Sequence, residues 1–80
     1  MRMSVMRVLR VQRGLTLVEL GQMVGLSEAP MSRIERRRRA LDADRAHRIA
    51  EALGVDVGAV FVEVAAGRYE VAPLDLVATG

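Results

Sequence analysis

The residues with the most informative chemistry lie between positions 28 and 36. In the segment EAPMSRIER, Arg33 can form two parallel hydrogen bonds to guanine, and Ser32 can bond to several base edges. Ala29 can touch a thymine methyl group, and Glu28 can accept a hydrogen bond from a cytosine amine. Arg36 stands at the far end of the segment. These five side chains could together recognise bases, provided that one element turns them all to the same side.

A helix over residues 28–36 would turn these side chains outward. Met31 and Ile34 recur at helical spacing and predict the buried face of this helix. Ser27 stands where a helix cap is favoured, and Pro30 falls at the third helical position, where no intrahelical donor is lost. The segment is therefore a candidate recognition helix.

A second short helix is predicted immediately before it. Thr16 followed by Glu19 indicates a capping box, and Gly25 supplies the positive φ that ends a helix. The apolar face between them consists of Leu17, Leu20, Met23 and Val24. Gly21 inside this helix costs roughly 1 kcal/mol relative to alanine, so it indicates a place where another backbone comes very close. Residues 16–36 therefore predict two short helices joined by a turn.

This pattern resembles the helix-turn-helix proteins of the lambda-repressor/Cro type, also called the xenobiotic-response-element family. The resemblance runs without gaps over residues 6–61. Its anchors are LRVQRGLT from Leu9, ELGQMVGLS from Glu19, SRIER from Ser32 and IAEALGV from Ile49. The resemblance implies an all-α fold, with a compact five-helix domain over residues 1–61 and a C-terminal extension over residues 62–80.

The resemblance also implies a sequence-specific regulator of transcription that binds double-stranded DNA. It would act as a repressor and as a homodimer on a palindromic operator. The predicted contacts to bases are Glu28, Ala29, Ser32, Arg33 and Arg36, on a helix in the major groove. The predicted contacts to DNA phosphates are Thr16, Leu17, Ser27, Arg37, Arg38 and Arg39. Considered alone, the run of four arginines at residues 36–39 would equally suit a solvated loop.

The sequence departs from the family pattern at four positions. The family commonly has glycine where Arg37 stands and proline where Leu41 stands. The resemblance therefore does not predict the conformation of the loop after the candidate recognition helix. It often has glutamine at the position of Leu17 and a polar or basic residue at that of Glu28. A carboxylate facing DNA repels phosphates unless it meets its base partner, so we expect low nonspecific affinity.

An ion pair between Arg10 and Glu35 is a further expectation from the resemblance. It would tie the first helix to the recognition helix. The alternative is two separate solvated charges on the surface, since charged side chains are mostly exposed.

Three other helices complete the predicted five. The first covers about residues 4–13 and ends at Gly14, with Met6, Leu9 and Val5 toward the core. The fourth follows a cap at Asp42 and runs to Gly54, with its apolar face formed by Ala43, Ala46, Ile49, Ala50 and Leu53. The fifth covers residues 57–61 after a cap at Asp56, and its Val57, Val60 and Phe61 would close the core.

Beyond residue 61 the sequence indicates a short β-hairpin. Residues 62–64 and 69–71 alternate in polarity around Ala-Ala-Gly-Arg. A two-stranded hairpin is marginal in water by itself, so it needs the core or a second subunit. Three interpretations remain open for this extension: a dimerisation element, an ordered extension on its own domain, or a frayed end.

Charge is distributed unevenly along the 80 residues. The net charge is +2, but residues 1–40 carry nine arginines against three acids, whereas residues 41–80 carry three arginines against seven acids. The basic half contains the candidate DNA-binding segment, as an anionic partner requires. All twelve cations are arginine, which fits the genome composition of a GC-rich bacterium or its phage as well as selection for phosphate binding.

The sequence gives no support to an enzyme. His47 is the single histidine and stands without a second ligand or a carboxylate relay, so we expect a surface or partly buried side chain and neither metal nor cofactor. There is no cysteine, and no apolar run approaches the roughly 20 residues that span a bilayer, so we expect a cytoplasmic protein without membrane contact. The remaining alternative is an antitoxin or adaptor that binds a protein partner, supported by Glu28 and Pro30.

Overall fold

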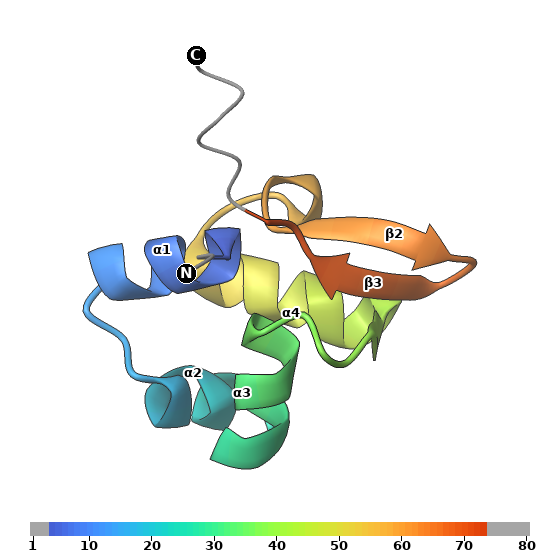
Figure 1. Cartoon of the computed structure of the whole chain (residues 1–80). Coiled ribbons are helices and arrows are strands. Elements are labelled where there is room, and N and C mark those ends of the chain that lie inside the picture. Colours follow the sequence, from blue (N-terminus) through green and yellow to red (C-terminus); the bar gives the residue numbers. More distant parts are fainter. Residues whose placement is uncertain (1–3, 74–80) are drawn as a thin grey trace.

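The computed structural model describes residues 4–73, and in them it shows four α-helices, one 3-10 turn and three short strands (Figure 1). The helices are α1 (Val5–Gln12), α2 (Leu17–Val24), α3 (Glu28–Glu35) and α4 (Ala43–Leu53), followed by the 3-10 turn η1 (Val57–Ala59). The strands are β1 (Leu41–Asp42), β2 (Phe61–Ala65) and β3 (Arg68–Val71).

The four predicted α-helices up to residue 54 are confirmed, and their ends follow from local chemistry. The side chains of Ser4 and Asp42 accept hydrogen bonds from the amides of Arg7 and Arg45, which caps α1 and α4. Gly54 ends α4 in the left-handed conformation, with φ of 76°. These ends are set by residues within one turn, so they could be located from the sequence.

The predicted fifth helix is not confirmed as a full helix, and a small sheet accompanies the helical part of the fold. Residues 57–59 form only a single 3-10 turn, and Phe61 already begins strand β2. The strands of the described residues form one antiparallel sheet in the order β1-β3-β2. Val60 and Phe61 are buried, so this segment closes the core as expected, but Phe61 does so from the start of a strand.

The predicted hairpin is confirmed, and β1 extends it to a third strand. Phe61 pairs with Val71 across the hairpin, while Leu41 pairs with Tyr69 on the other side of β3. The main chain after β3 then reaches α1, where Val5 donates its amide to the Ala72 carbonyl at 3.1 Å. The end of the hairpin that follows β3 is thus attached to α1. The rest of the predicted extension, residues 74–80, lies outside the described residues, and the division of the chain at residue 61 stays a prediction.

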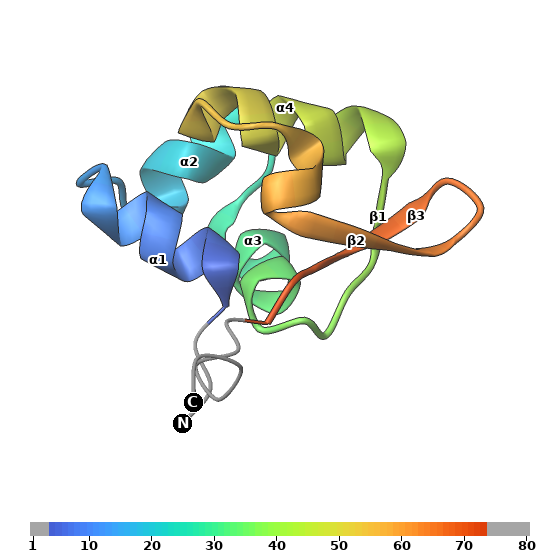
Figure 2. The same cartoon turned by 90° about the horizontal axis from the view of Figure 1, so that it is seen from above.

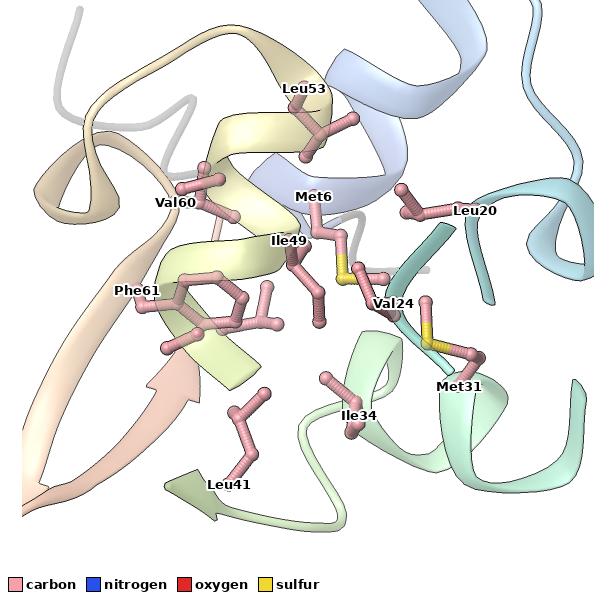
Figure 3. Close-up of a cluster of buried hydrophobic side chains, with 13 residues drawn as sticks. Met6, Leu20, Val24, Met31, Ile34, Leu41, Ile49, Leu53, Val60 and Phe61 are labelled. Atoms are coloured by element: carbon pink, nitrogen blue, oxygen red, sulfur yellow. The ribbon is translucent and has the colours of Figure 1, made fainter. Parts of the chain in front are cut away.

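One hydrophobic core joins the helices to the sheet. Figure 3 shows side chains from every α-helix meeting there, with Phe61 and Val60 approaching from the sheet side. The largest side chains with almost no exposed surface are Met6, Leu20, Met31, Ile34, Ile49, Leu53, Val60 and Val71. Met23, expected on the apolar face of α2, is instead 58% exposed.

The arrangement leaves α2 and α3 on one side of α4, while the tip of the hairpin projects away from the helices (Figures 1 and 2). None of the helices in residues 4–73 is long and apolar enough to cross a membrane.

Candidate nucleic-acid interface

Helix α3 presents the predicted base-contacting residues at the surface. Met31 and Ile34 are buried beneath it, as their spacing predicted. The other face carries Glu28, Ala29, Arg33 and Arg36, which are exposed, and Ser32, which is partly buried. Pro30 is accommodated in the first turn of the helix. The structure therefore brings the five candidates to one helix with an apolar face holding it in place, while their contacts with bases stay a prediction.

The turn between α2 and α3 explains the glycine inside α2. A Cβ atom added to Gly21 would collide with the Leu26 carbonyl oxygen and lie 3.1 Å from Cγ of Met31. The Leu26 amide donates to the Gly21 carbonyl at 2.8 Å, and Gly25 between them has φ of 77°. The predicted close backbone approach is confirmed, and it fixes how α3 leaves α2.

The N-terminus of α2 carries the predicted capping box. The Thr16 hydroxyl accepts from the Glu19 amide at 3.0 Å, and the Glu19 carboxylate accepts from the Thr16 amide at 2.8 Å. The hydrogen bond donated by the Thr16 amide, with a smaller contribution from the Thr16 side chain, holds the pKa of the Glu19 carboxyl below its usual value near 4.5. Thr16 is exposed and Leu17 partly buried, so the start of α2 is open to a phosphate.

Ser27 occupies the N-cap position of α3, but its side chain makes no capping hydrogen bond. The expectation that its hydroxyl caps the helix is therefore wrong. The residue is exposed. Because the hydroxyl is not engaged at the helix terminus, its predicted contact with a phosphate does not compete with a cap.

Arg10 of α1 and Glu35 of α3 form the expected ion pair. Nε and Nη2 of Arg10 donate to the two carboxylate oxygens of Glu35, at 2.8 and 3.1 Å. Nη1 of Arg10 donates to the Leu15 carbonyl at 2.8 Å. The two side chains are only 12% and 8% exposed, so they are not separate solvated charges. One guanidinium thereby connects α1, the loop before α2 and the end of α3.

The arginine run starts with a regular helix ending. The amides of Arg37 and Arg38 donate to the carbonyls of Ile34 and Arg33, at 3.0 and 2.8 Å. This is the Schellman pattern, which requires a left-handed residue, and Arg37 supplies it with φ of 63°. Nε of Arg37 also donates to the Val71 carbonyl of β3, at 2.9 Å. Arg37 thus has a structural contact that the sequence did not reveal, in addition to its predicted role at a phosphate.

The next two arginines are exposed, but they have different surroundings. Arg38 and Arg39 both lie in the loop between α3 and β1. Arg39 shares a small cavity with two arginines that the sequence analysis did not single out, Arg45 and Arg68. The signal that could have found Arg45 is its place in the first turn of α4, whereas Arg68 joins only because β3 pairs with β1.

His47 is exposed, and its ring contacts Ala43 and Tyr69. Its Nδ1 lies 2.8 Å from the Ala43 carbonyl, and its ring meets Tyr69 edge-on with centroids 6.4 Å apart. Within residues 4–73, no three His, Cys, Asp or Glu side chains are grouped as a metal site would need.

Comparison with known proteins places this geometry in a family. Residues 4–60 match the family model of a helix-turn-helix domain. Among solved structures, the chain is similar to the clp gene regulator ClgR from Corynebacterium glutamicum, with 30% sequence identity and a TM-score of 0.65. That similarity covers 68% of this chain and 57% of the ClgR chain. The search of curated proteins found no match. Since the family model covers α1 to η1 together with the buried turn and the outward face of α3, the chain belongs to the helix-turn-helix family of DNA-binding proteins.

Proposed function

We propose that this DNA-binding protein regulates transcription as a repressor, by binding as a homodimer to a palindromic operator. The family match and the similarity to a gene regulator support transcriptional regulation. The observation that carries the proposal is the outward face of α3, whose opposite side is buried in the core and whose C-terminal end is held by the pair of Glu35 with Arg10. A helix held in this way can enter the major groove as a rigid unit.

The proposed base contacts follow from the chemistry of that face. Arg33, which is exposed near the middle of α3, would donate two hydrogen bonds to O6 and N7 of a guanine. Ala29 would contact a thymine methyl group, and Glu28 a cytosine amine. Ser32 and Arg36 would reach the neighbouring bases. Each good bidentate contact discriminates against the wrong base by roughly 1–3 kcal/mol.

The proposed phosphate contacts lie on both sides of α3. On one side, the start of α2 at Thr16 and Leu17 offers amides and the positive end of the helix dipole, with Ser27 near the beginning of α3. On the other side, Arg37, Arg38 and Arg39 follow the helix directly. Such contacts set the register of a protein on DNA, and base contacts then give specificity.

The proposed homodimer would use the hairpin. Strand β2 is at the edge of the sheet in the described residues, and its Val62 and Val64 are each 51% exposed. Two exposed valines on an edge strand favour burial against another surface. A palindromic site needs two copies of α3, so a symmetric contact of hairpins would satisfy both requirements.

The test is selection of bound fragments from genomic DNA, followed by repetition with Arg33→Ala. We expect a palindromic motif, and we expect the variant to lose preference at one defined base pair while keeping the rest. The matched control is Arg48→Ala, since Arg48 lies on α4, where it pairs with Asp44 at 3.2 Å. The control should leave every base preference unchanged.

Two outcomes would contradict recognition of bases by α3, and a third would contradict only the palindrome. Binding without any motif, with affinity falling steeply as salt rises, would mean attraction to phosphates alone. No binding of DNA, with retention of a protein partner, would favour the antitoxin or adaptor alternative on the same scaffold. A motif without symmetry would remove the palindrome and leave direct recognition by α3.

A further inference from the structure

A cavity of about 170 Å³ lies beside the loop that follows α3. Its apolar lining comes from Leu26 in the turn, Ile34 of α3 and Leu41 of β1. Its polar lining comes mainly from Arg39, Arg45 and Arg68, and we call it the arginine cavity. Typical sites for organic ligands occupy about 300–1,000 Å³, so this one admits a single small group.

The three guanidinium groups reach the arginine cavity from three different elements. Arg39 comes from the loop after α3, Arg45 from the first turn of α4, and Arg68 from the first position of β3. Arg68 is paired with Asp42 in the antiparallel ladder of β1 and β3, and this pairing places the backbone of Arg68 beside the elements that carry Arg39 and Arg45. Neither Arg39 nor Arg68 forms a salt bridge with any carboxylate in residues 4–73.

The carboxylate in the cavity lining is already engaged. Asp42 caps α4 by accepting from the Arg45 amide at 3.2 Å, and it pairs with Nη1 of Arg45 at 3.3 Å. Three arginines against one aspartate leave the lining with two positive charges. The N-terminus of α4 lies at the same place, since Asp42 and Arg45 belong to its first turn, and it adds the positive end of a helix dipole.

We propose that the arginine cavity binds a phosphoryl group. Guanidinium groups match the oxygens of phosphate with forked hydrogen bonds. A phosphate monoester dianion balances the two positive charges of the lining, and a singly charged backbone phosphodiester neutralises one of them. The apolar side of the cavity suits the carbon side of a phosphate ester. The phosphoryl group belongs either to a free phosphate monoester or to the DNA backbone, and the following experiment separates these sources.

The first arm uses free anions and the full chain without DNA, so it does not depend on the proposed function. Inorganic phosphate and phenyl phosphate are titrated while NMR follows the side-chain Nε–H signals of arginine, against chloride at equal ionic strength. We expect saturable shifts at Arg39, Arg45 and Arg68. Arg68→Ala should weaken binding about tenfold or more, as loss of one charged hydrogen-bond partner implies. Arg48→Ala is the control on α4 and should change the affinity less than twofold.

The second arm uses selected operator DNA in which single phosphates are replaced by neutral methylphosphonates. If a backbone phosphate occupies the cavity, one replacement should weaken binding as much as Arg68→Ala does, and the two changes together should weaken it no further. Saturable binding of free phosphate without this coupling would assign the cavity to a small molecule. Absence of both effects in variants that melt like the parent would overturn the proposal, and unchanged operator binding would then leave the proposed function standing.

Discussion

In the ion pair of Arg10 and Glu35, a single guanidinium group holds three segments of the chain together. Its three hydrogen bonds connect α1 to the end of α3 and to the loop before α2. Because both side chains are mostly buried, neither charge is compensated by water. Helix α3 is therefore fixed at its C-terminal end by an ion pair whose other partner, Arg10, lies in α1.

Removal of one partner should have a large effect on stability. We expect Arg10→Ala to lower the free energy of unfolding by about 3–5 kcal/mol, because the Glu35 carboxylate would stay buried without its counter-ion. Unfolding in urea measures this value. Arg48→Ala breaks an exposed pair instead, and it should cost less than about 1 kcal/mol. Equal losses of unfolding free energy in the two variants would show that the buried pair of Arg10 and Glu35 contributes no more to stability than an exposed pair.

At Arg37, the effects of backbone strain and of a side-chain hydrogen bond on stability can be measured separately. Its left-handed backbone disfavours a side chain by about 1–2 kcal/mol, while its Nε bond to Val71 favours arginine. Alanine at this position keeps the strain and loses the bond, whereas glycine loses both. Unfolding in urea should therefore find Arg37→Gly more stable than Arg37→Ala by roughly 1 kcal/mol. The opposite order would mean that the left-handed conformation is lost in the variants.

The turn between α2 and α3 depends on one missing side chain. We expect Gly21→Ala to destabilise the protein by about 1–3 kcal/mol, since its Cβ would collide with the backbone carbonyl of Leu26, which cannot move aside like a flexible side chain. DNA binding should weaken as well, because the turn sets the direction of α3. Gly58→Ala is the control, with nothing within 4 Å of the added atom, and thermal unfolding should find it close to the parent.

The helix caps predict how stability changes with pH. The hydrogen bond that the Thr16 amide donates to the Glu19 carboxylate, with a smaller contribution from the Thr16 side chain, lowers the pKa of Glu19. The bond from the Arg45 amide lowers the pKa of Asp42 from its usual 3.8. Groups with a lowered pKa in the folded state stabilise it above their unfolded values, and this stabilisation disappears as the pH falls through the folded values.

The melting temperature should therefore be nearly constant from neutral pH to about pH 5 and then fall below about pH 4.5. Glu19→Gln and Asp42→Asn cannot titrate, so each should reduce this acid-dependent fall. Asp56→Asn removes a charge of the same sign from a side chain that makes no capping hydrogen bond, and it should leave the fall as in the parent. Identical pH profiles for all three variants would exclude the caps as the cause.

In the molecule as a whole, helix α3 and the exposed hairpin of β2 and β3 lie apart from each other. Figure 1 shows α3 below α4, with the hairpin extending to one side. A contact through β2 would therefore leave the outward face of α3 uncovered. This separation is what a dimer that reads two half-sites requires.

The proposed dimer can be tested through its apolar side chains. We expect Val62→Asp with Val64→Asp to give a monomer in sedimentation equilibrium, since two charges would have to be buried in the interface. Affinity for a palindromic site should fall, while affinity for a single half-site is retained. Val11→Asp changes a valine of α1 that is 56% exposed and should not affect association. A parent chain that is monomeric both free and on DNA would contradict the dimer.

Local signals in the amino-acid sequence were enough to predict the parts of this protein that depend on neighbouring residues. Caps such as Thr16 and Asp42, the left-handed ending at Gly25 and the spacing of Met31 and Ile34 act within one or two helical turns. They sufficed to locate four helices, the turn and the outward face of α3. The predicted hairpin also held, because alternation around Gly67 is a local signal.

Features that depend on residues far apart in the chain became visible when the packing of the helices and the sheet was known. The residues expected to form a fifth helix became a 3-10 turn and a strand, because pairing with β3 and burial of Phe61 favour an extended backbone there. Pairing of β1 with β3 brought Arg68 to Arg39 and Arg45. Helical spacing and capping contain no information about such long-range pairing, since it is set by which apolar surfaces remain to be covered after the helices have packed.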